Sequence, residues 1–419
     1  MHATDLHEEN TLMSVKHHAL VLNLHQPLDN LEYLLAEKPW EAREILYAYD
    51  RIPRFLWAYE DIARIHLSLS GSLLETLSSP RFQHETYGLV DCSALLWHLQ
   101  NKNIIEILGT GYYYPVLPLI PKADWQEQLS RWQGIARHLF REDSFQGFWP
   151  PEMGFAMELI PVLKQLGYRY VMVDGEHVRS VTPMTEAELL YRPHVARHGD
   201  EEIVVIVRDR QLSNAMATGM NYEQFAGEVA MRTQDCATPP LVTTCCDGEN
   251  GPWFRNTHEE TNFWGGFYGD LLKAAREQGE IHPIFIHDYL ERYGVLGEVT
   301  VNTGAWNTEW HDGQDFGQWS GSPAQQKALR RLEVVSREVH DAIREANQRE
   351  VGGQEQSVLE EAHWRLLRAE TSCNFYWGED WVNRANRDLD DAEATLSRFR
   401  AKKYQIDPDP GWHTNGSSG

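Results

Sequence analysis

Six carboxyl side chains lie at or close to the ends of short apolar segments, where an enzyme could use them. They are Glu152, Asp174, Glu176, Asp209, Asp247 and Glu249. Two carboxyl groups about 5–5.5 Å apart can cleave a glycosidic bond with retention, one as an ionised nucleophile and the other as a protonated acid. These residues are therefore candidates for such a pair, provided that the fold brings two of them to one cleft.

Glu152 lies in the segment 148–155, which reads FWPPEMGF. The two prolines stiffen the backbone immediately before it, and aromatic side chains flank it on both sides. A solvated surface charge does not need such surroundings. The segment therefore favours a functional carboxylate over the structural alternative, a loop glutamate that caps the following helix.

Asp247 lies in the segment 243–254, TTCCDGENGPWF, where an apolar run delivers it beside glycines and aromatic residues. Such surroundings raise the pKa of a carboxyl group by desolvating its charged form, and a general acid needs a raised pKa. The structural alternative is a turn, because Asp-Gly is a common turn signal. The local sequence gives these two interpretations equal weight.

Short apolar runs rich in β-branched residues predict the buried strands that would position these carboxyl groups. They cover 19–24, 104–108, 170–173, 203–207, 241–244 and 284–286. Helical patterns such as 157–166, with Gly167 as a C-terminal cap, lie between some of them. This alternation predicts an α/β fold with a parallel sheet or barrel, and in a barrel the carboxyl ends of the strands converge on the catalytic face. A doubly wound sheet would gather the same ends, but no glycine-rich nucleotide-binding motif is present.

From about Pro323 the apolar residues repeat every three or four positions, which predicts helices. A Gly-Gly pair at 352–353 ends the first helix, a capping box of Ser357 and Glu360 starts the second, and 385–399 forms a third. We therefore expect a catalytic barrel over 15–322, a helical C-terminal region packed on the barrel over 323–405, and a flexible tail over 406–419.

The composition narrows the classes of partner. With 38 Lys and Arg against 62 Asp and Glu, the chain has a net charge of -24, which repels nucleic acid and anionic membrane surfaces. A neutral sugar suits this charge better, and 15 tryptophans and 17 tyrosines could supply flat faces on which sugar rings stack. The structural alternative for most of these aromatic residues is the core or its rim.

The cysteines and the hydropathy pattern indicate the compartment. The 5 cysteines show no CxxC spacing, which predicts neither a disulfide framework nor a structural zinc site. The first residues are polar and acidic, and no apolar run is long enough to span a membrane. We therefore expect a cytoplasmic protein.

Five segments, in this order along the chain, resemble the motifs of glycoside hydrolase family 57. They are HQP at 25–27, EILGTGYYYP at 106–115, WPPEMGF at 149–155, CDGENG at 246–251 and ETS at 370–372. The resemblance spans nearly the whole chain and implies a distorted (β/α)7 barrel with a helical C-terminal region. It also implies that Glu152 is the nucleophile and Asp247 the acid/base of a retaining double displacement on α-linked glucans. We expect an α-amylase-like hydrolase. The alternative is a 4-α-glucanotransferase or branching enzyme with the same catalytic pair, because local sequence does not reveal water exclusion.

The resemblance and the local sequence together predict a set of substrate-binding residues. They are His25, Glu106, Trp149, Arg208, Asp209, Trp253, Trp306 and Trp377. His25 would bind sugar hydroxyls near the scissile bond, with a strand-end core histidine as the structural alternative. Glu106 would accept a hydroxyl or hold His25. The tryptophans would form platforms for sugar rings.

Two positions depart from the family pattern. Arg208 and Asp209 resemble an Arg-Asp element of family amylases that continues with Ser-Asp, whereas this chain continues with Ser213 and Asn214. Tyr114 stands where many members carry histidine. Both departures leave the catalytic pair intact and bear on the choice of substrate.

Other classes of function remain open at this point. Neither HExxH nor a Cys-His zinc spacing appears, so we expect no metal and no cofactor. Related barrels use zinc, which keeps a metal-dependent carbohydrate hydrolase or deacetylase as an alternative. A non-catalytic glycan-binding protein is a further alternative, which the presence of both carboxylates disfavours. The expected partner is an α-glucan or a maltooligosaccharide, and the oligomeric state does not follow from the sequence.

Overall fold

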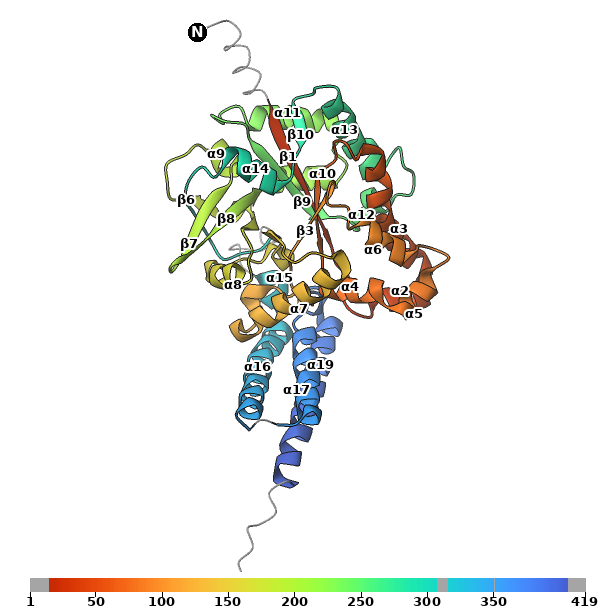
Figure 1. Cartoon of the computed structure of the whole chain (residues 1–419), viewed down its shortest axis with the longest axis vertical. Helices are drawn as coiled ribbons and strands as arrows, with labels where there is room; N and C mark the ends of the chain where they lie inside the picture. The colour runs from red at the N-terminus through yellow and green to blue at the C-terminus, as the bar shows by residue number, and fades with distance from the viewer. Residues whose placement is uncertain (1–14, 307–315, 350, 406–419) are drawn as a thin grey trace, which may run out of the picture. The chain divides into compact units, whose positions relative to one another are not determined.

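The computed structural model describes residues 15–306, 316–349 and 351–405, and the chain divides into two compact units (Figure 1). The first unit is Met1–Trp319 and the second is Ser320–Gly419. The expected tail over 406–419 lies outside the described residues. Each helix in the described part of the chain is too short or too polar to cross a membrane.

The first unit is built on parallel strands that close into a distorted barrel. They are β1 (Lys16–Leu24), β2 (Ile65–Leu69), β3 (Ile105–Leu108), β4 (Gly147–Phe148), β5 (Tyr170–Asp174), β8 (Glu201–Arg208) and β9 (Leu241–Asp247). β1 pairs in parallel with β9 and β2, β2 with β3, β4 with β5, and β5 with β8. Two local links complete the ring: Gly109 bridges to Phe148, and the Asp209 N–H donates to the Thr243 carbonyl. The predicted (β/α)7 barrel is confirmed, and it is distorted where the ring depends on these local links.

Within the described residues, four further strands lie outside this ring. β10 (Ile281–Pro283) pairs in parallel with the first residues of β1, and β7 (His194–His198) pairs antiparallel with β8. β6 (Val178–Ser180) and β11 (Val299–Val301) form a separate antiparallel ribbon.

Helices surround the barrel strands along the chain, and the last of them, α15 (Gly317–Ser320), spans the boundary between the two units. They are α2 (Asn30–Glu37), α3 (Pro39–Leu56), α4 (Gly71–Ser78), α5 (Pro80–Thr86), α6 (Cys92–His98), α7 (Lys122–Phe140), α8 (Ile160–Gln165), α9 (Glu186–Tyr191), α10 (Arg210–Ala217), α11 (Tyr222–Arg232), α12 (Gly251–Arg255), α13 (Gly269–Arg276), α14 (Ile286–Tyr293) and α15 (Gly317–Ser320). Several begin at caps that the sequence supplies, such as Ser70 before α4 and Asp91 before α6. β1 is buried along nearly its whole length, because both faces of a parallel strand are covered.

Most of the predicted strands are confirmed, and the exceptions have local causes. The prediction of a strand over 284–286 is wrong, because β10 ends earlier and Ile286 already begins α14, where its N–H donates to His66 Nε2 at 3.0 Å. β2 was not predicted, because His66 and Ser68 interrupt its apolar pattern although both are fully buried. Gly167 follows α8 with a φ of 88°, which confirms the predicted cap.

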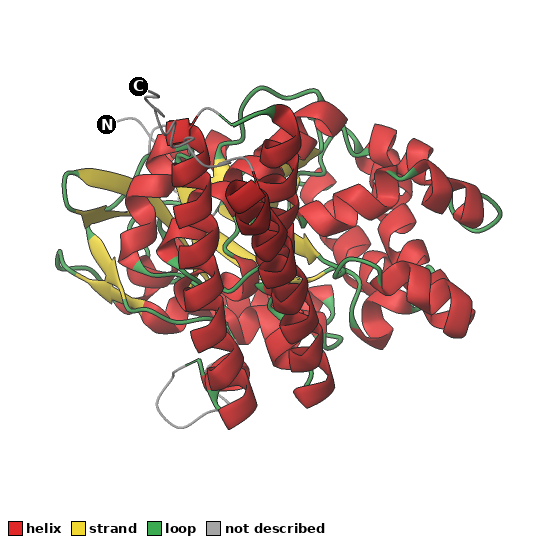
Figure 2. Ribbon diagram, turned by 90° about the horizontal axis from the view of Figure 1, so that it is seen from below, coloured by secondary structure: helices red, strands yellow, loops and turns green. Residues whose placement is uncertain are grey.

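In the second unit, the described regular elements are all helices, drawn red in Figure 2. They are α16 (Pro323–Arg349), α17 (Gly353–Ala369), α18 (Cys373–Tyr376) and α19 (Glu379–Gln405). α16, α17 and α19 pack against one another, and residues at the predicted spacing, such as Leu332 and Val335, are buried. The predicted start at Ser357 is wrong: α17 begins at Gly353, and the Ser357 hydroxyl donates to the Gly353 carbonyl within the helix. Gly352 already supplies the extended backbone of the N-cap, so no serine cap is needed.

Candidate active site

The two predicted catalytic residues lie at the carboxyl ends of barrel strands. Asp247 is the last residue of β9, and Glu152 follows the short strand β4. His25 follows β1, and the register of β1 against β9 sets Asn23 opposite Asp247. These strands run parallel, so their carboxyl ends lie at the same end of the barrel. A β/α barrel carries its active site at that end.

The backbone around Glu152 has an unusual conformation that several contacts hold. Glu152 and Met153 have φ values of 56° and 51°, in the left-handed region that costs a non-glycine residue about 1–3 kcal/mol. The Glu152 carbonyl accepts from the Trp306 N–H at 3.0 Å, and the Glu152 N–H donates to the Tyr114 hydroxyl at 3.3 Å. The Trp306 indole N–H also donates to Glu152 Oε2 at 2.7 Å. Both the backbone and the carboxylate of Glu152 are therefore held by Trp306.

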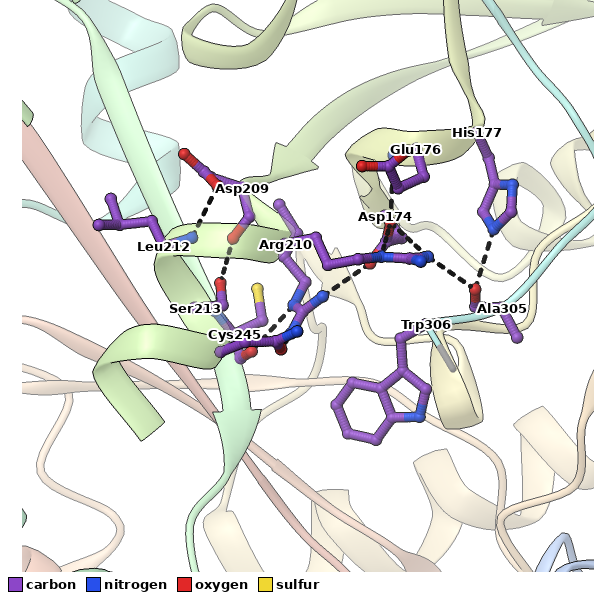
Figure 3. Close-up of polar contacts among 12 residues, drawn as sticks. Asp174, Glu176, His177, Asp209, Arg210, Leu212, Ser213, Cys245, Ala305 and Trp306 are labelled. Carbon is purple, nitrogen blue, oxygen red and sulfur yellow. Dashed lines mark hydrogen bonds and ion pairs between the residues drawn. The ribbon is translucent and has the colours of Figure 1, made fainter. Parts of the chain in front are cut away.

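A buried ion cluster lies at the ends of β5 and β8 (Figure 3). Asp174 accepts from Arg208 Nη1 at 2.7 Å and from Arg210 Nε at 2.8 Å. Arg208 also donates to the Cys245 carbonyl at 3.0 Å and to Asn214 Oδ1 at 2.8 Å. All three charged side chains are buried. Because one carboxylate faces two guanidinium groups, the cluster keeps a net positive charge.

This cluster anchors the segment that carries Trp306. Figure 3 shows Arg210 and His177 pointing at the Ala305 carbonyl, with Arg210 Nη2 at 3.3 Å and His177 Nε2 at 2.9 Å. A side chain at Gly304 would come within 2.3 Å of the His177 ring, so only glycine fits there without a shift. These contacts hold Ala305, and they thereby position the indole of the next residue against the carboxylate described above.

Asp247 has a different electrostatic environment. Burial raises the pKa of its carboxyl group, whereas hydrogen bonds from Asn23 Nδ2 at 2.8 Å and Asn250 Nδ2 at 3.0 Å, and the charge of Arg208, lower it. The net shift of the pKa is upward, so burial dominates and the neutral form persists to a higher pH than in water. Such a carboxyl group can hold a proton for donation and can later accept one.

Tyr114 connects the surroundings of both carboxyl groups. Burial raises the pKa of its hydroxyl, and the charges of Glu152 and Asp247 raise it further. Both carboxylates therefore lie within electrostatic range of one phenol. The phenol oxygen accepts from Trp149 Nε1 at 3.1 Å, and the ring stacks on that of His25 with centroids 4.1 Å apart.

His25 and Glu249 extend this buried polar layer. His25 Nδ1 lies 2.8 Å from Ser70 Oγ, and burial lowers the pKa of the imidazole to about 3, so the ring is neutral at pH 7. The backbone N–H of His25 donates to Glu249 Oε1 at 2.9 Å. Burial and the charge of Asp247 raise the pKa of Glu249 well above its usual value, which favours a neutral Glu249.

Comparison with known proteins assigns this arrangement to a family. The family profile described as "Glycosyl hydrolase family 57" matches residues 6–302. The chain belongs to glycosyl hydrolase family 57. The resemblance that the five motifs indicated is therefore confirmed.

Curated relatives of this family 57 chain include two kinds of enzyme. An α-amylase from Pyrococcus horikoshii is 31% identical over 278 residues, which are 66% of this chain and 40% of that protein. A 4-α-glucanotransferase from Thermococcus litoralis is 30% identical over 278 residues, which are 66% of this chain and 38% of that protein. The chain thus spans about two-fifths of the length of these relatives.

Solved structures support the fold over nearly the whole chain. The 4-α-glucanotransferase from Thermococcus litoralis matches with a TM-score of 0.65 at 21% identity, over 94% of this chain and 60% of that chain. A GH57 branching enzyme from Thermococcus kodakaraensis matches with a TM-score of 0.74 at 14% identity, over 93% of this chain and 92% of that chain. At these identities the likeness shows the family 57 fold, with a helical C-terminal region.

Two of the four tryptophan platforms predicted for this family 57 chain, Trp149 and Trp306, need correction. Trp149 is 0% exposed and directs its indole N–H at a buried tyrosine hydroxyl, so it cannot stack on a sugar. Trp306 is buried and acts through its N–H, not through an exposed ring face. Trp253 is half-buried, and its role as a platform stays a prediction. Trp377 belongs to the second unit, where it is 61% exposed and stays a predicted platform.

The predicted role of Asp209 in substrate binding also needs correction. Its Oδ1 accepts from the Leu212 N–H at 2.9 Å and caps α10, and its Oδ2 accepts from the Tyr191 hydroxyl at 2.6 Å and from Arg232 at 3.3 Å. In Figure 3 the carboxylate points toward Leu212. Both oxygens therefore stabilise the barrel, whereas the neighbouring Arg208 belongs to the cluster beside the site.

Glu106 does not hold His25, which was one of the two roles predicted for it. It lies near the amino end of β3, where Glu106 Oε1 accepts from the Tyr170 hydroxyl and Oε2 contacts His287 Nδ1, each at 2.7 Å. Burial alone would raise the pKa of Glu106, but hydrogen bonds with His287 and His66 lower it to about 2. The motif position is therefore structural in this chain, at the end of the barrel opposite to the candidate site.

Sequence reasoning missed the two amides that hold Asp247. Asn23 lies two residues before the HQP motif, and its role depends on the parallel register of β1 and β9. Asn250 lies within the fourth motif, three residues after Asp247, which was a local signal for such a contact. Asp174 was a candidate at a strand end, but its buried pairing with two arginines had no local signal.

Proposed function

We propose that this chain is a retaining enzyme that acts on α-linked glucans, with Glu152 as the nucleophile and Asp247 as the acid/base. The observation that carries the proposal is the contrast between their surroundings. The Trp306 N–H at 2.7 Å favours the ionised form of Glu152, whereas burial favours the neutral form of Asp247. A retaining glycosidase needs one ionised and one protonated carboxyl group at the same pH.

The proposed reaction has two steps. In the first, Glu152 attacks the anomeric carbon while Asp247 transfers its proton to the glycosidic oxygen, so that the leaving sugar departs and a glycosyl-enzyme ester forms. In the second, ionised Asp247 takes a proton from water as the water oxygen attacks the same carbon. The ester bond breaks, Glu152 is released as a carboxylate, and Asp247 ends protonated.

Tyr114 fits a supporting role in both steps. Its oxygen accepts two N–H groups, from the Trp149 indole and the Glu152 backbone, so its own proton is left to donate elsewhere. Because its pKa is raised, the phenol stays neutral across the working range. We propose that this proton is donated to the substrate or to a carboxylate oxygen beside the scissile bond.

Hydrolysis is the proposed principal outcome, and transfer to a sugar hydroxyl is a second candidate. The α-amylase from Pyrococcus horikoshii supports the first, at 31% identity. The 4-α-glucanotransferase from Thermococcus litoralis supports the second, at 30% identity over the same share of this chain. The two outcomes need the same catalytic pair and differ in whether water or a sugar resolves the glycosyl-enzyme.

Product analysis separates the outcomes. The purified chain is incubated with amylose and with maltoheptaose, and both reducing ends and chain lengths are followed. Shorter products with rising reducing ends support hydrolysis, whereas longer or branched products at nearly constant reducing ends support transfer. No reaction with either substrate would refute the proposed function.

Azide rescue tests the two residue roles separately. With α-maltosyl fluoride, whose leaving group needs no acid, Glu152→Gly plus azide should yield the β-azide by direct displacement. Asp247→Asn plus azide should yield the α-azide, because the glycosyl-enzyme still forms. The same azide anomer from both variants would contradict the assignment.

A further inference from the structure

A surface cavity lies at the end of the barrel opposite to Glu152 and Asp247. Its volume is about 410 Å³, within the range of about 300–1,000 Å³ that ligand sites occupy. It includes Ile104, the residue before β3, and Glu60, which precedes β2, so it faces the amino ends of those strands. The cavity is therefore separate from the candidate active site.

Two exposed tryptophans form the aromatic part of this cavity. Trp57 follows α3 and is 64% exposed, and Trp97 lies in the last turn of α6 and is 62% exposed. α3 and α6 pack against each other, and they are labelled close together in Figure 1. The His98 ring meets both indoles edge-on, with centroid distances of 5.3 Å to Trp57 and 4.9 Å to Trp97. The three rings form one continuous surface, unlike the single exposed apolar residues that are common on proteins.

Polar groups border these rings. Asn101 Nδ2 donates to Glu60 Oε1 at 2.9 Å, which holds the two side chains together across the cavity wall. Gln100 Nε2 donates to the Leu139 carbonyl at 2.9 Å, which leaves its Oε1 without a hydrogen bond to any described residue. The ring nitrogens of His98 likewise make no hydrogen bond within the described ranges. The border therefore offers several donors and acceptors of neutral hydrogen bonds.

We propose that this cavity is a second carbohydrate-binding site, which holds an α-glucan chain away from the catalytic residues. The proposal rests on the proposed function, because it takes the ligand from the substrate class of the active site. Indole faces stack on the apolar C–H faces of sugar rings, and amide, carboxylate and imidazole groups bind hydroxyls. A neutral ligand also suits Glu60 and the net charge of -24, which disfavour nucleic acid and anionic lipid.

The location gives the site a defined consequence. A polysaccharide long enough to reach both ends of the barrel can bind the cavity and the active site together, which raises its local concentration at the catalytic residues. A short oligosaccharide in the active site cannot do so. Loss of the cavity should therefore weaken binding and turnover of amylose and leave turnover of maltotriose unchanged.

The test compares Trp57→Ala/Trp97→Ala with Trp40→Ala, a tryptophan that is 63% exposed elsewhere on α3 and serves as the matched control. Binding is measured by gel retardation in amylose or glycogen, in a Glu152→Gln background that prevents digestion. Thermal unfolding verifies that each variant folds. We expect about tenfold weaker retardation for the double variant, the order of one aromatic contact, and no change for the control.

Each outcome decides the proposal. Weaker retardation of the double variant, with no change in the control, supports the proposal. This binding result does not depend on whether the wild-type chain cleaves amylose, so a failure of the proposed function would be seen separately in the activity assay. Retardation equal to that of the parent would overturn it, as would the absence of any retardation. If the parent self-associates but does not bind polysaccharide, and the double variant no longer self-associates, the surface is a contact between copies of the chain. That result would also overturn the proposal.

Discussion

The hydrogen bond from Trp306 to Glu152 makes a quantitative prediction. Trp306→Phe keeps a buried aromatic ring but removes the N–H that donates to Glu152 Oε2 at 2.7 Å. A hydrogen bond to a charged group contributes about 1.5–3 kcal/mol, so kcat/KM for maltoheptaose should fall roughly 10- to 150-fold. The lost donor stabilised the ionised carboxylate. The acidic limb of the pH–activity profile should therefore move to higher pH.

Trp149→Phe is the matched control, because Trp149 is also a buried indole and its N–H donates to the neutral Tyr114 hydroxyl at 3.1 Å. A neutral hydrogen bond contributes about 0.5–1.5 kcal/mol, so the loss of kcat/KM should be about tenfold or less and the acidic limb should stay in place. If the acidic limb of the pH–activity profile lies at the same pH in wild type and Trp306→Phe, the reasoning is refuted. An acidic limb that moves equally in Trp306→Phe and Trp149→Phe would refute it too, because the effect would then come from general repacking.

Two further predictions concern other parts of the barrel. The lowered pKa of Glu106 stabilises the fold above the usual carboxyl pKa of about 4.5, and this stability is lost as the pH falls toward 2. The raised pKa of His287 has the opposite dependence, because its stability is lost as the pH rises above about 6.5. Glu106→Gln should therefore lower the unfolding free energy in urea by about 3 kcal/mol near pH 5.5 and by much less at pH 3, and an equal loss at both would contradict the ionic role. Gly304→Ala would bring a methyl group within 2.3 Å of the His177 ring, so the segment before Trp306 must shift. The variant should lose roughly 100-fold in kcat, and full activity would show that this segment does not position the site.

The sequence could predict the candidate catalytic residues because their signals are local. Prolines and aromatic residues surround Glu152, and glycines and aromatic residues surround Asp247, within motifs of a few residues. The strands also follow from local apolar runs, except where polar residues are buried, as with His66 in β2. The contact from Trp306 to Glu152 joins residues 154 positions apart, so no local pattern reveals it. The prediction that Glu106 could hold His25 failed because the motif does not show at which end of the strand Glu106 lies.

The departure at Asn214 has a consequence for Asp247, the proposed acid/base residue. Asn214 Oδ1 accepts from Arg208 Nη2 at 2.8 Å, and the charge of Arg208 lowers the pKa of Asp247 against the larger effect of burial. An asparagine leaves that positive charge less neutralised than an aspartate would. The chain therefore limits the rise in the pKa of Asp247, which in the proposed mechanism releases its proton in one step and recovers it in the next.

Asn214→Asp tests this balance. The added carboxylate would offset the charge of Arg208, so the pKa of Asp247 should rise and the basic limb of the pH profile should move to higher pH, by up to about one pH unit. The pH dependence of kcat/KM for maltoheptaose measures the shift, and Asn214→Ser, which adds no charge, is the control. A basic limb that moves equally in both variants would mean that Asn214 acts by holding Arg208 in place. If the basic limb moves in neither Asn214→Asp nor Asn214→Ser, burial alone sets the protonation of Asp247. Only a shift confined to Asn214→Asp supports an electrostatic role for this position. In that role the uncharged amide of Asn214 binds Arg208, and the charge of Arg208 lowers the pKa of Asp247, the proposed acid/base residue.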